Sequence, residues 1–89
     1  MIYIVAYDLN KQGKDYDGLF KAIQSYPDNI NCQKSVWLIS TNATAENIYD
    51  TLKPHIDGDD FILITNWGNS YRALLSPGVV NWLKNHGIG

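Results

Sequence analysis

The chain has 89 residues, of which 45% are hydrophobic and 18% are charged, as is typical of a globular domain. Seven Lys and Arg residues face nine Asp and Glu residues, so the formal net charge of −2 lacks the basic field of a duplex-binding protein. A single cysteine excludes an intramolecular disulfide. With no signal-peptide pattern and no apolar run near the ~20 residues of a membrane span, we expect one cytoplasmic domain over residues 1–89.

The first half of the chain predicts strands on either side of a helix. Residues 2–9 are apolar at both alternating sets of positions, a pattern typical of a strand covered on both faces. Apolar residues then recur at helical spacing in residues 14–26, with Asp15 as the N-cap and Pro27 at the end. The stretch "INCQKSVWLIST", residues 30–41, is long enough for one strand or a bent pair.

The second half predicts a helix, one or two strands and a final helix. Thr44 is the expected cap of a helix in "AENIYDTLKPHI", which Pro54 ends or tightens. "DGDD" predicts a solvated turn, "FILITNW" a strand with two apolar faces, and "YRALL" a short strand. The tail "SPGVVNWLKNHG" predicts a last helix, with start and stop signals at Ser76, Pro77 and Gly87.

Strands that alternate with amphipathic helices predict an α+β fold with helices on at least one face of a sheet. If both main helices pack on one face, as short crossovers of fixed hand allow, apolar strand residues on the other face remain in water. A second copy of the chain is the cover that we expect there. The sequence therefore predicts a homodimer or a larger homo-oligomer.

Two stretches carry a resemblance to a known group of proteins. "IYIVAYDLN", then a helix, then "CQKSVWLIS" resembles the ferredoxin-like superfamily of CRISPR-associated protein two and virulence-associated protein D. The fuller string "YDLNKQGKDYDGLFKAI", with a closing "WLK", resembles more narrowly the small SinR-family proteins of bacteria and phages. The main part of the resemblance covers residues 2–40, and the matching positions are Asp8, Gln33, Ser35 and Val36.

This resemblance implies a ferredoxin-like βαββαβ-type sheet with helices on one face, a C-terminal helix and a homodimer. In some members it implies a metal-dependent endonuclease, whose metal ligand is the aspartate that closes the first strand, here Asp8. Magnesium sites usually use one or two carboxylates with phosphate and water oxygens, so two Asp8 side chains near a dimer axis would make a shared site. Ser35 and Gln33 are then candidates to position the phosphate or a water.

A second role for Asp8 needs no metal. Aspartate commonly accepts hydrogen bonds from backbone amides at a turn, and "DLNKQG" has the composition of one. We therefore predict that Asp8 mainly shapes the exit from the first strand. The run of basic residues that CRISPR-associated members carry after this aspartate is reduced here to Lys11, Lys14 and Lys21, with acids between them. Tight binding of duplex nucleic acid is therefore not expected.

Aromatic and polar residues outline a candidate ligand site. Trp37 and Trp67 are expected on strands, where an exposed ring stacks on a base or anchors a protein partner. After Trp67, "GNSYR" offers backbone amides, an aromatic ring and the only arginine, which suits an anion or a nucleotide, while a plain turn is the simpler explanation. The candidate ligand-binding residues are Gln33, Ser35, Trp37, Trp67, Asn69, Ser70, Tyr71 and Arg72.

Other chemically notable side chains are predicted to be structural. His55 and His86 have no partner at a catalytic spacing and are expected at helix ends. Cys32 has no neighbouring pattern that would activate a thiolate, so we expect a small buried side chain. Trp82 lies on a helical stripe with apolar neighbours and is expected in the core.

Two functions remain open at this point. The acidic net charge and the small number of candidate catalytic side chains favour a non-catalytic homodimeric binding protein without a cofactor. Such a protein captures a nucleotide-like ligand or blocks a host protein. A phage origin suits a chain of this size. The alternative is a metal-dependent endoribonuclease or endonuclease that uses Asp8 and Mg²⁺ at the dimer axis.

Overall fold

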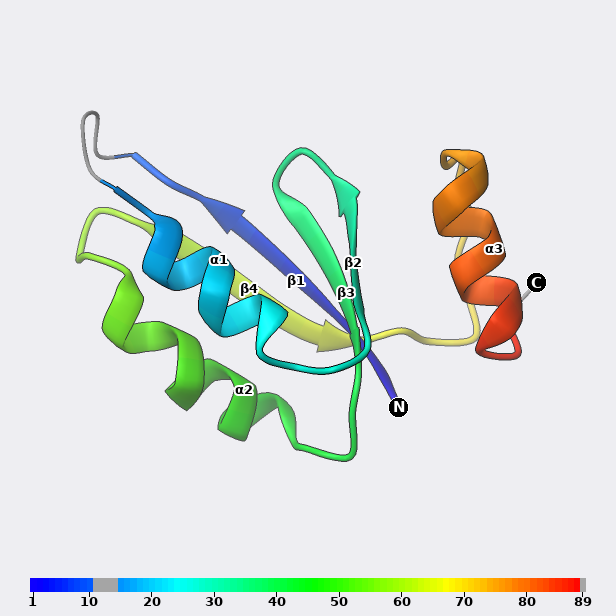
Figure 1. The fold of residues 1–89 in the computed structure, drawn as a ribbon, viewed down its shortest axis with the longest axis horizontal. Helices are drawn as coiled ribbons and strands as arrows, with labels where there is room; N and C mark the ends of the chain where they lie inside the picture. Colours follow the sequence, from blue (N-terminus) through cyan, green and yellow to red (C-terminus); the bar gives the residue numbers. More distant parts are fainter. Residues whose placement is uncertain (11–14, 89) are drawn as a thin grey trace.

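A four-stranded antiparallel sheet forms the centre of the structure, a computed structural model that describes residues 1–10 and 15–88. The strands lie in the order β2-β3-β1-β4 and span Ile2–Asp8 (β1), Asn29–Gln33 (β2), Val36–Ser40 (β3) and Phe61–Asn66 (β4). The helical segments are Asp17–Gln24 (α1), Ala45–Leu52 (α2), the 3₁₀ turn Lys53–His55 (η1) and Pro77–Asn85 (α3). The predicted α+β fold, a ferredoxin-like βαββαβ sheet with a C-terminal helix, is confirmed (Figure 1).

Strand β1 is an inner strand, paired with β3 on one side and with β4 on the other. The register aligns Val5 with Trp37 of β3 and with Ile64 of β4. Because side chains alternate across a strand, Tyr3 and Val5 lie on one face of the sheet and Ile4 lies on the other. The two apolar sets predicted for residues 2–9 therefore face two different layers.

Helices α1 and α2 cover one face of the sheet (Figure 1). Their buried residues are spaced four apart, so they lie on one side of each helix and pack against Val5. This core contains Leu19 and Ile23 from α1, and Ile48 and Leu52 from α2. The two helices therefore bury only one of the two apolar faces of the sheet.

The helix ends follow the predicted signals, with one shift. Thr44 Oγ1 accepts a hydrogen bond from the Asn47 N–H at 3.1 Å, and α2 passes into the 3₁₀ turn that contains Pro54. Helix α1 begins at Asp17, two residues after the predicted cap. The predicted cap residue, Asp15, still accepts the Asp17 N–H through Oδ1 at 2.9 Å. Lys11 and Lys14 lie outside the described residues.

The structure decides one open alternative among the predicted strands and corrects another predicted strand. Residues 30–41 are the bent pair rather than one strand, because the chain turns at Lys34 and Ser35 between β2 and β3. The short strand predicted at "YRALL" is wrong, because residues 71–75 form no strand. The chain leaves the sheet after Trp67, whose N–H makes a bond of 2.8 Å to the Ile2 carbonyl, and runs towards α3.

Helix α3 packs on the face opposite α1 and α2, at one end of the sheet. Val79 and Leu83 are buried there against Ile2 and Leu38. The helix stands apart from the other two in Figure 1, after an extended segment that follows β4. It ends before Gly87, whose φ of 81° is a left-handed conformation that glycine adopts without strain.

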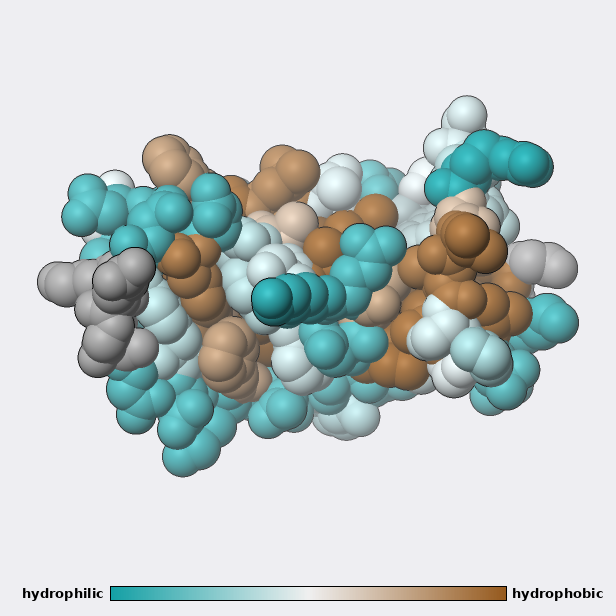
Figure 2. All heavy atoms as spheres, turned by 90° about the horizontal axis from the view of Figure 1, so that it is seen from above, coloured by the Kyte–Doolittle hydropathy of each residue, from teal (hydrophilic) through white to brown (hydrophobic). Residues whose placement is uncertain are grey.

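Much of this second face remains uncovered. Phe61 is 66% exposed and Leu63 is 62% exposed, and both point from β4 away from α1 and α2. Apolar side chains are visible at the surface in several groups in Figure 2, with a large group towards the end of the molecule that carries α3. No helix in the described residues is long and apolar enough to cross a membrane.

A polar cluster fixes the end of α3 to the start of β2. Asp28 accepts a hydrogen bond from Trp82 Nε1 at 3.1 Å and lies 2.5 Å from His86 Nε2. The other ring nitrogen of His86 lies 2.6 Å from the Trp82 carbonyl oxygen, and the Trp82 and His86 rings are stacked with centroids 3.9 Å apart. The Trp82 carbonyl, followed by Asp28, raises the pKa of His86, against the lowering effects of burial and of the Met1 ammonium. Each ring nitrogen of His86 thus has an oxygen acceptor beside it, an arrangement that suits the protonated imidazole because both of its nitrogens donate hydrogen bonds.

We predict that this cluster makes stability depend on pH. The folded-state pKa of His86 lies above its unfolded value of about 6.5, so the stabilisation is complete below about pH 6.5 and is lost as the pH rises through the folded pKa. His86→Gln removes this part of the pH dependence of the melting temperature, whereas His55→Gln, at an exposed histidine, retains it. Equal pH profiles for wild type and His86→Gln would contradict the assignment.

Candidate functional site

Asp8 closes strand β1 on the uncovered face of the sheet. It is aligned with Phe61 of β4, and strand alternation directs its side chain to the same face as Ala6, away from α1 and α2. The side chain is exposed. Within the described residues, its carboxylate has no hydrogen-bond or ion-pair partner, and only its backbone carbonyl accepts a long bond from the Asn10 amide at 3.5 Å.

Asp60, and not Asp8, accepts hydrogen bonds from the described residues on either side of residues 11–14. Asp60 is only 7% exposed, and its carboxylate accepts hydrogen bonds from the Asn10 N–H at 3.0 Å, the Tyr16 hydroxyl at 2.8 Å and the Asp57 N–H at 2.9 Å. The prediction that Asp8 accepts the backbone amides here is therefore wrong. The predicted solvated "DGDD" turn is present, with Gly58 and Asp59 exposed, but Asp60 differs from the prediction because it is buried where β4 begins beside the end of β1.

A shallow hollow of about 280 Å³ surrounds Asp8. Most of its lining is apolar and comes from the ends of β1 and β4: Ala6, Tyr7, Asp8, Phe61, Ile62 and Leu63. A carboxylate with no hydrogen-bond or ion-pair partner in the described part of the chain thus lies at the margin of an exposed apolar patch. We call this patch, made by Ala6, Phe61 and Leu63, the open-face patch.

The β2–β3 turn brings further polar groups to this end of β1. The Tyr7 N–H donates to the Ser35 carbonyl at 3.1 Å, which extends the β1–β3 ladder beyond the pair of Ala6 and Val36. The exposed Ser35 predicted for the site therefore lies next to the residue before Asp8. Lys34 is exposed in the same turn, and the sequence prediction missed it because only the β1–β3 pairing brings it here.

The described residues of one chain bring no cluster of several metal-ligating side chains together. The described residues contain no group of three or more His, Cys, Asp or Glu side chains that could hold a metal ion. An exposed carboxylate without a partner is, however, an oxygen ligand of the kind that Mg²⁺ takes, and Mg²⁺ often needs only one or two of them. The donor set fits Mg²⁺ when a second copy of the chain contributes its own Asp8.

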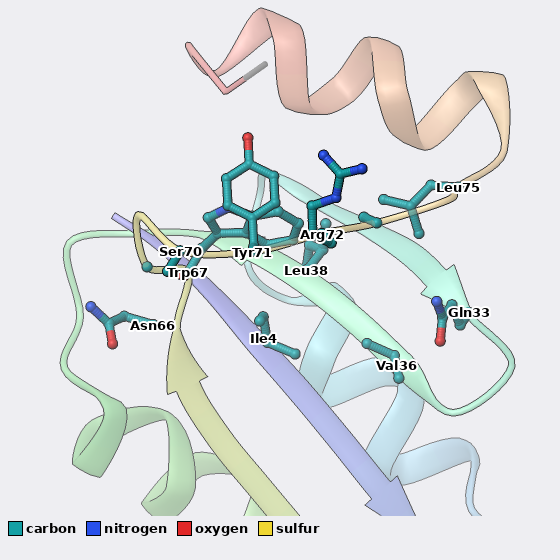
Figure 3. A pocket seen from close by; sticks show the side chains of 12 residues that line it. Ile4, Gln33, Val36, Leu38, Asn66, Trp67, Ser70, Tyr71, Arg72 and Leu75 are labelled. Atoms are coloured by element: carbon teal, nitrogen blue, oxygen red, sulfur yellow. The ribbon is translucent and has the colours of Figure 1, made fainter.

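A larger cavity of about 340 Å³ lies between the uncovered face and the segment after β4, and we call it the loop cavity (Figure 3). Its apolar part is formed by side chains of β1 and β3, namely Ile4, Val36 and Leu38. The structure brings five of the eight predicted ligand residues together here: Gln33, Trp67, Ser70, Tyr71 and Arg72.

The other three predicted ligand residues lie elsewhere. Ser35 lies in the β2–β3 turn, and Asn69 lines a separate hollow that Gly87 also lines. Trp37 packs against the α1 and α2 core, and its Nε1 donates to the Tyr7 hydroxyl at 3.1 Å. The prediction of an exposed Trp37 is therefore wrong, because the register with Val5 turns its ring towards the helices.

The remaining candidates have structural positions. His86 is the C-cap residue of α3 and His55 ends η1, as predicted. Cys32 is partly buried beside the α3 core, and burial raises the pKa of its thiol, which disfavours the reactive thiolate. Trp82 is partly buried in the same core.

The fold and the position of Asp8 define a small ferredoxin-like protein with an acid at the end of its first strand. The chain belongs to the Cas2 family, because the family described as CRISPR associated protein Cas2 matches residues 1–73. The broader resemblance seen in the sequence is thereby confirmed. The narrower resemblance to SinR-family proteins is not supported by this match, and α3, which begins at residue 77, lies outside it.

A solved structure has the same fold. The chain is similar to a hypothetical protein, TT1823, from Thermus thermophilus, with a TM-score of 0.64 and 23% sequence identity. The similarity covers 82% of this chain and 88% of that chain. At this level of identity the similarity supports the fold and carries no information about function.

We predict that Asp60 is a structural residue. Asp60→Ala leaves partly buried N–H and O–H donors without an acceptor, which should lower the free energy of unfolding by about 2–4 kcal/mol in urea denaturation. Asp60→Asn keeps one acceptor oxygen and should lower the free energy of unfolding by less than Asp60→Ala does. The neighbouring exposed Asp59→Ala is the matched control and should change stability by less than about 0.5 kcal/mol. Equal effects at the two positions would refute the role of Asp60.

Proposed function

We propose that the protein is a homodimeric, metal-dependent endonuclease in which two Asp8 carboxylates, one from each copy, bind a divalent cation. The observation that carries this proposal is the exposed Asp8 carboxylate, which has no partner in the described residues, while Asp60 accepts the neighbouring Asn10 N–H. Membership of the Cas2 family supports this function over the non-catalytic binding protein that the acidic composition favours.

The open-face patch supports the dimer. Helix α3 covers only the other end of this face, around Ile2 and Leu38, so Phe61 and Leu63 remain in water in a single copy. Burying each such side chain in a dimer interface contributes about 1.5–3 kcal/mol to the free energy of association. A two-fold symmetric contact uses the same patch on both copies, so a carboxylate at the margin of the patch is brought towards its own counterpart.

The residues around Asp8 suit the handling of a phosphodiester. When bound, the divalent cation supplies a Lewis acid for a phosphate oxygen and lowers the pKa of a water nucleophile. The Asp8 carboxylates bind and orient this cation, the Lys34 ammonium attracts the phosphate, and the Ser35 hydroxyl donates to one of its oxygens. The net charge of −2 favours a single-stranded substrate, because a duplex requires more cations along its backbone.

We predict that Asp8→Asn abolishes cleavage without harming the fold. With Mg²⁺ or Mn²⁺ and end-labelled single-stranded RNA and DNA, the variant should lose at least about 100-fold in rate, because an amide binds a divalent cation poorly. Its free energy of unfolding should change by less than about 0.5 kcal/mol, since the carboxylate has no partner among the described residues. Asp59→Asn is the control with the same charge change. Cleavage that survives Asp8→Asn, or survives a chelator, would refute the proposal.

We also predict that the open-face patch holds the dimer together. Light scattering of the wild type should give about twice the chain mass of 10.1 kDa. The double variant Phe61→Ser, Leu63→Ser should shift the mass to the monomer, because it removes the apolar area that association buries. Tyr49→Ser, at an exposed aromatic residue on α2, should leave the dimer intact. A wild type that is monomeric at micromolar concentration would overturn the dimer and the shared site.

A further inference from the structure

The loop cavity has the size and lining of a small-ligand site. Its volume of about 340 Å³ falls in the range of about 300–1,000 Å³ that such sites occupy. Ile4, Val36 and Leu38 make an apolar floor on the strands, and the segment after β4 makes the opposite wall. This combination of a sheet floor and a polar loop favours a ligand with one flat apolar part and one polar part.

The loop wall offers an aromatic surface. The Trp67 and Tyr71 rings meet edge to face, with centroids 4.8 Å apart and an interplanar angle of 65°. Tyr71 is nevertheless 44% exposed, so a large part of its ring remains open to contact. Aromatic rings in this state stack on nucleic-acid bases, which contributes about 1–3 kcal/mol per base.

The charge of the lining is positive, unlike that of the whole chain. Among the described residues, no Asp or Glu lines the loop cavity, and Arg72, the only arginine in the sequence, is the only charged residue that lines it. Figure 3 shows Tyr71 and Arg72 standing out from the loop on the side of α3, away from Ile4 on the strand. A guanidinium at the mouth of a cavity is suited to a phosphate, which it binds through two parallel hydrogen bonds.

One buried donor on this wall also lacks an acceptor. The indole Nε1 of Trp67 is buried and has no hydrogen-bond partner within the described residues. Leaving such a group unsatisfied costs about 1–3 kcal/mol in the protein without a ligand. The Ser70 hydroxyl and the Gln33 amide line the same cavity and are exposed.

We propose that the loop cavity binds one nucleotide unit, with the base against Tyr71 and Trp67 and the phosphate on Arg72. The ligand is a free nucleoside monophosphate or the phosphorylated end of a single strand, which share this chemistry. The site is independent of the proposed nuclease centre. Ile4 and Asp8 are four residues apart on one strand, or roughly 13 Å at about 3.3 Å per residue.

The test is isothermal titration calorimetry of the full chain with AMP, UMP, adenosine, inorganic phosphate and a 5′-phosphorylated dinucleotide. We expect the monophosphates to bind with a Kd below about 1 mM, and adenosine and phosphate to bind at least about tenfold more weakly, since each lacks one half of the recognised chemistry. A dinucleotide that binds more tightly than AMP indicates a strand end, and equal or weaker binding indicates a free nucleotide. Equal affinity for phosphate and AMP would overturn the proposal, as would absence of binding.

Substitutions in the loop cavity test whether AMP binds there. Arg72→Gln and Tyr71→Ala should each weaken AMP binding at least about tenfold, which corresponds to about 1.4 kcal/mol. Lys21→Gln removes the same charge from an exposed position on α1, across the sheet, and should leave the Kd unchanged. Circular dichroism shows whether each variant is folded. If folded Arg72→Gln and Tyr71→Ala proteins bind AMP as the wild type does, the proposal is wrong.

Asp8→Asn separates this proposal from the proposed function. The variant should bind AMP with wild-type affinity, because Asp8 does not line the loop cavity. Retained binding together with an absence of any nuclease activity would remove the proposed function and leave the nucleotide site standing. Loss of AMP binding in folded Asp8→Asn protein would instead overturn the independence of the two sites, and with it this assignment.

Discussion

The alternation of side chains along β1 is the constraint on which the rest of the structure depends. This strand lies inside the sheet, so each side chain must face one of two layers. Val5 faces α1 and α2 and is fully buried, while Ile4 faces the other layer and is only partly buried. Helices α1 and α2 both lie on one face and α3 covers only one end of the other, so part of that second face remains available for contacts outside the core.

Two carboxylates, Asp60 and Asp8, lie at the same corner of the sheet and differ in burial and hydrogen bonding. Asp60 is buried, and its carboxylate accepts hydrogen bonds from the Asn10 N–H, the Tyr16 hydroxyl and the Asp57 N–H. Asp8 is exposed and has no partner in the described residues. A buried carboxylate needs several donors to offset its lost hydration, whereas an exposed one needs none and is free to bind a cation. This difference is the basis for expecting Asp60 to govern stability and for proposing Asp8 as the cation ligand.

Helix α3 determines which part of the second face remains open. Its buried residues pack over Ile2 and Leu38, and the cluster of Asp28, Trp82 and His86 holds its C-terminal end in place. The extended segment that leads to this helix forms one wall of the loop cavity. One end of the face thus carries a cavity, and the other carries the open-face patch beside Asp8. Helix α3 lies outside the matched Cas2 region, whereas the lining residues of the loop cavity lie inside it, with the exception of Leu75.

The sequence by itself determined the elements and the fold class. Local signals act over a few residues, so Thr44 and Gly87 mark helix ends. The apolar residues at both alternating sets of positions from Ile2 to Tyr7 predict a sheet with two faces to cover. The tertiary structure decided which side chains are available. Asn10 meets Asp60 across 50 residues of sequence, and the strand register turns Trp37 to the helices. Burial and hydrogen bonding between distant segments leave no local pattern, so only the folded chain distinguishes Asp8 from Asp60 and brings Arg72 to the loop cavity.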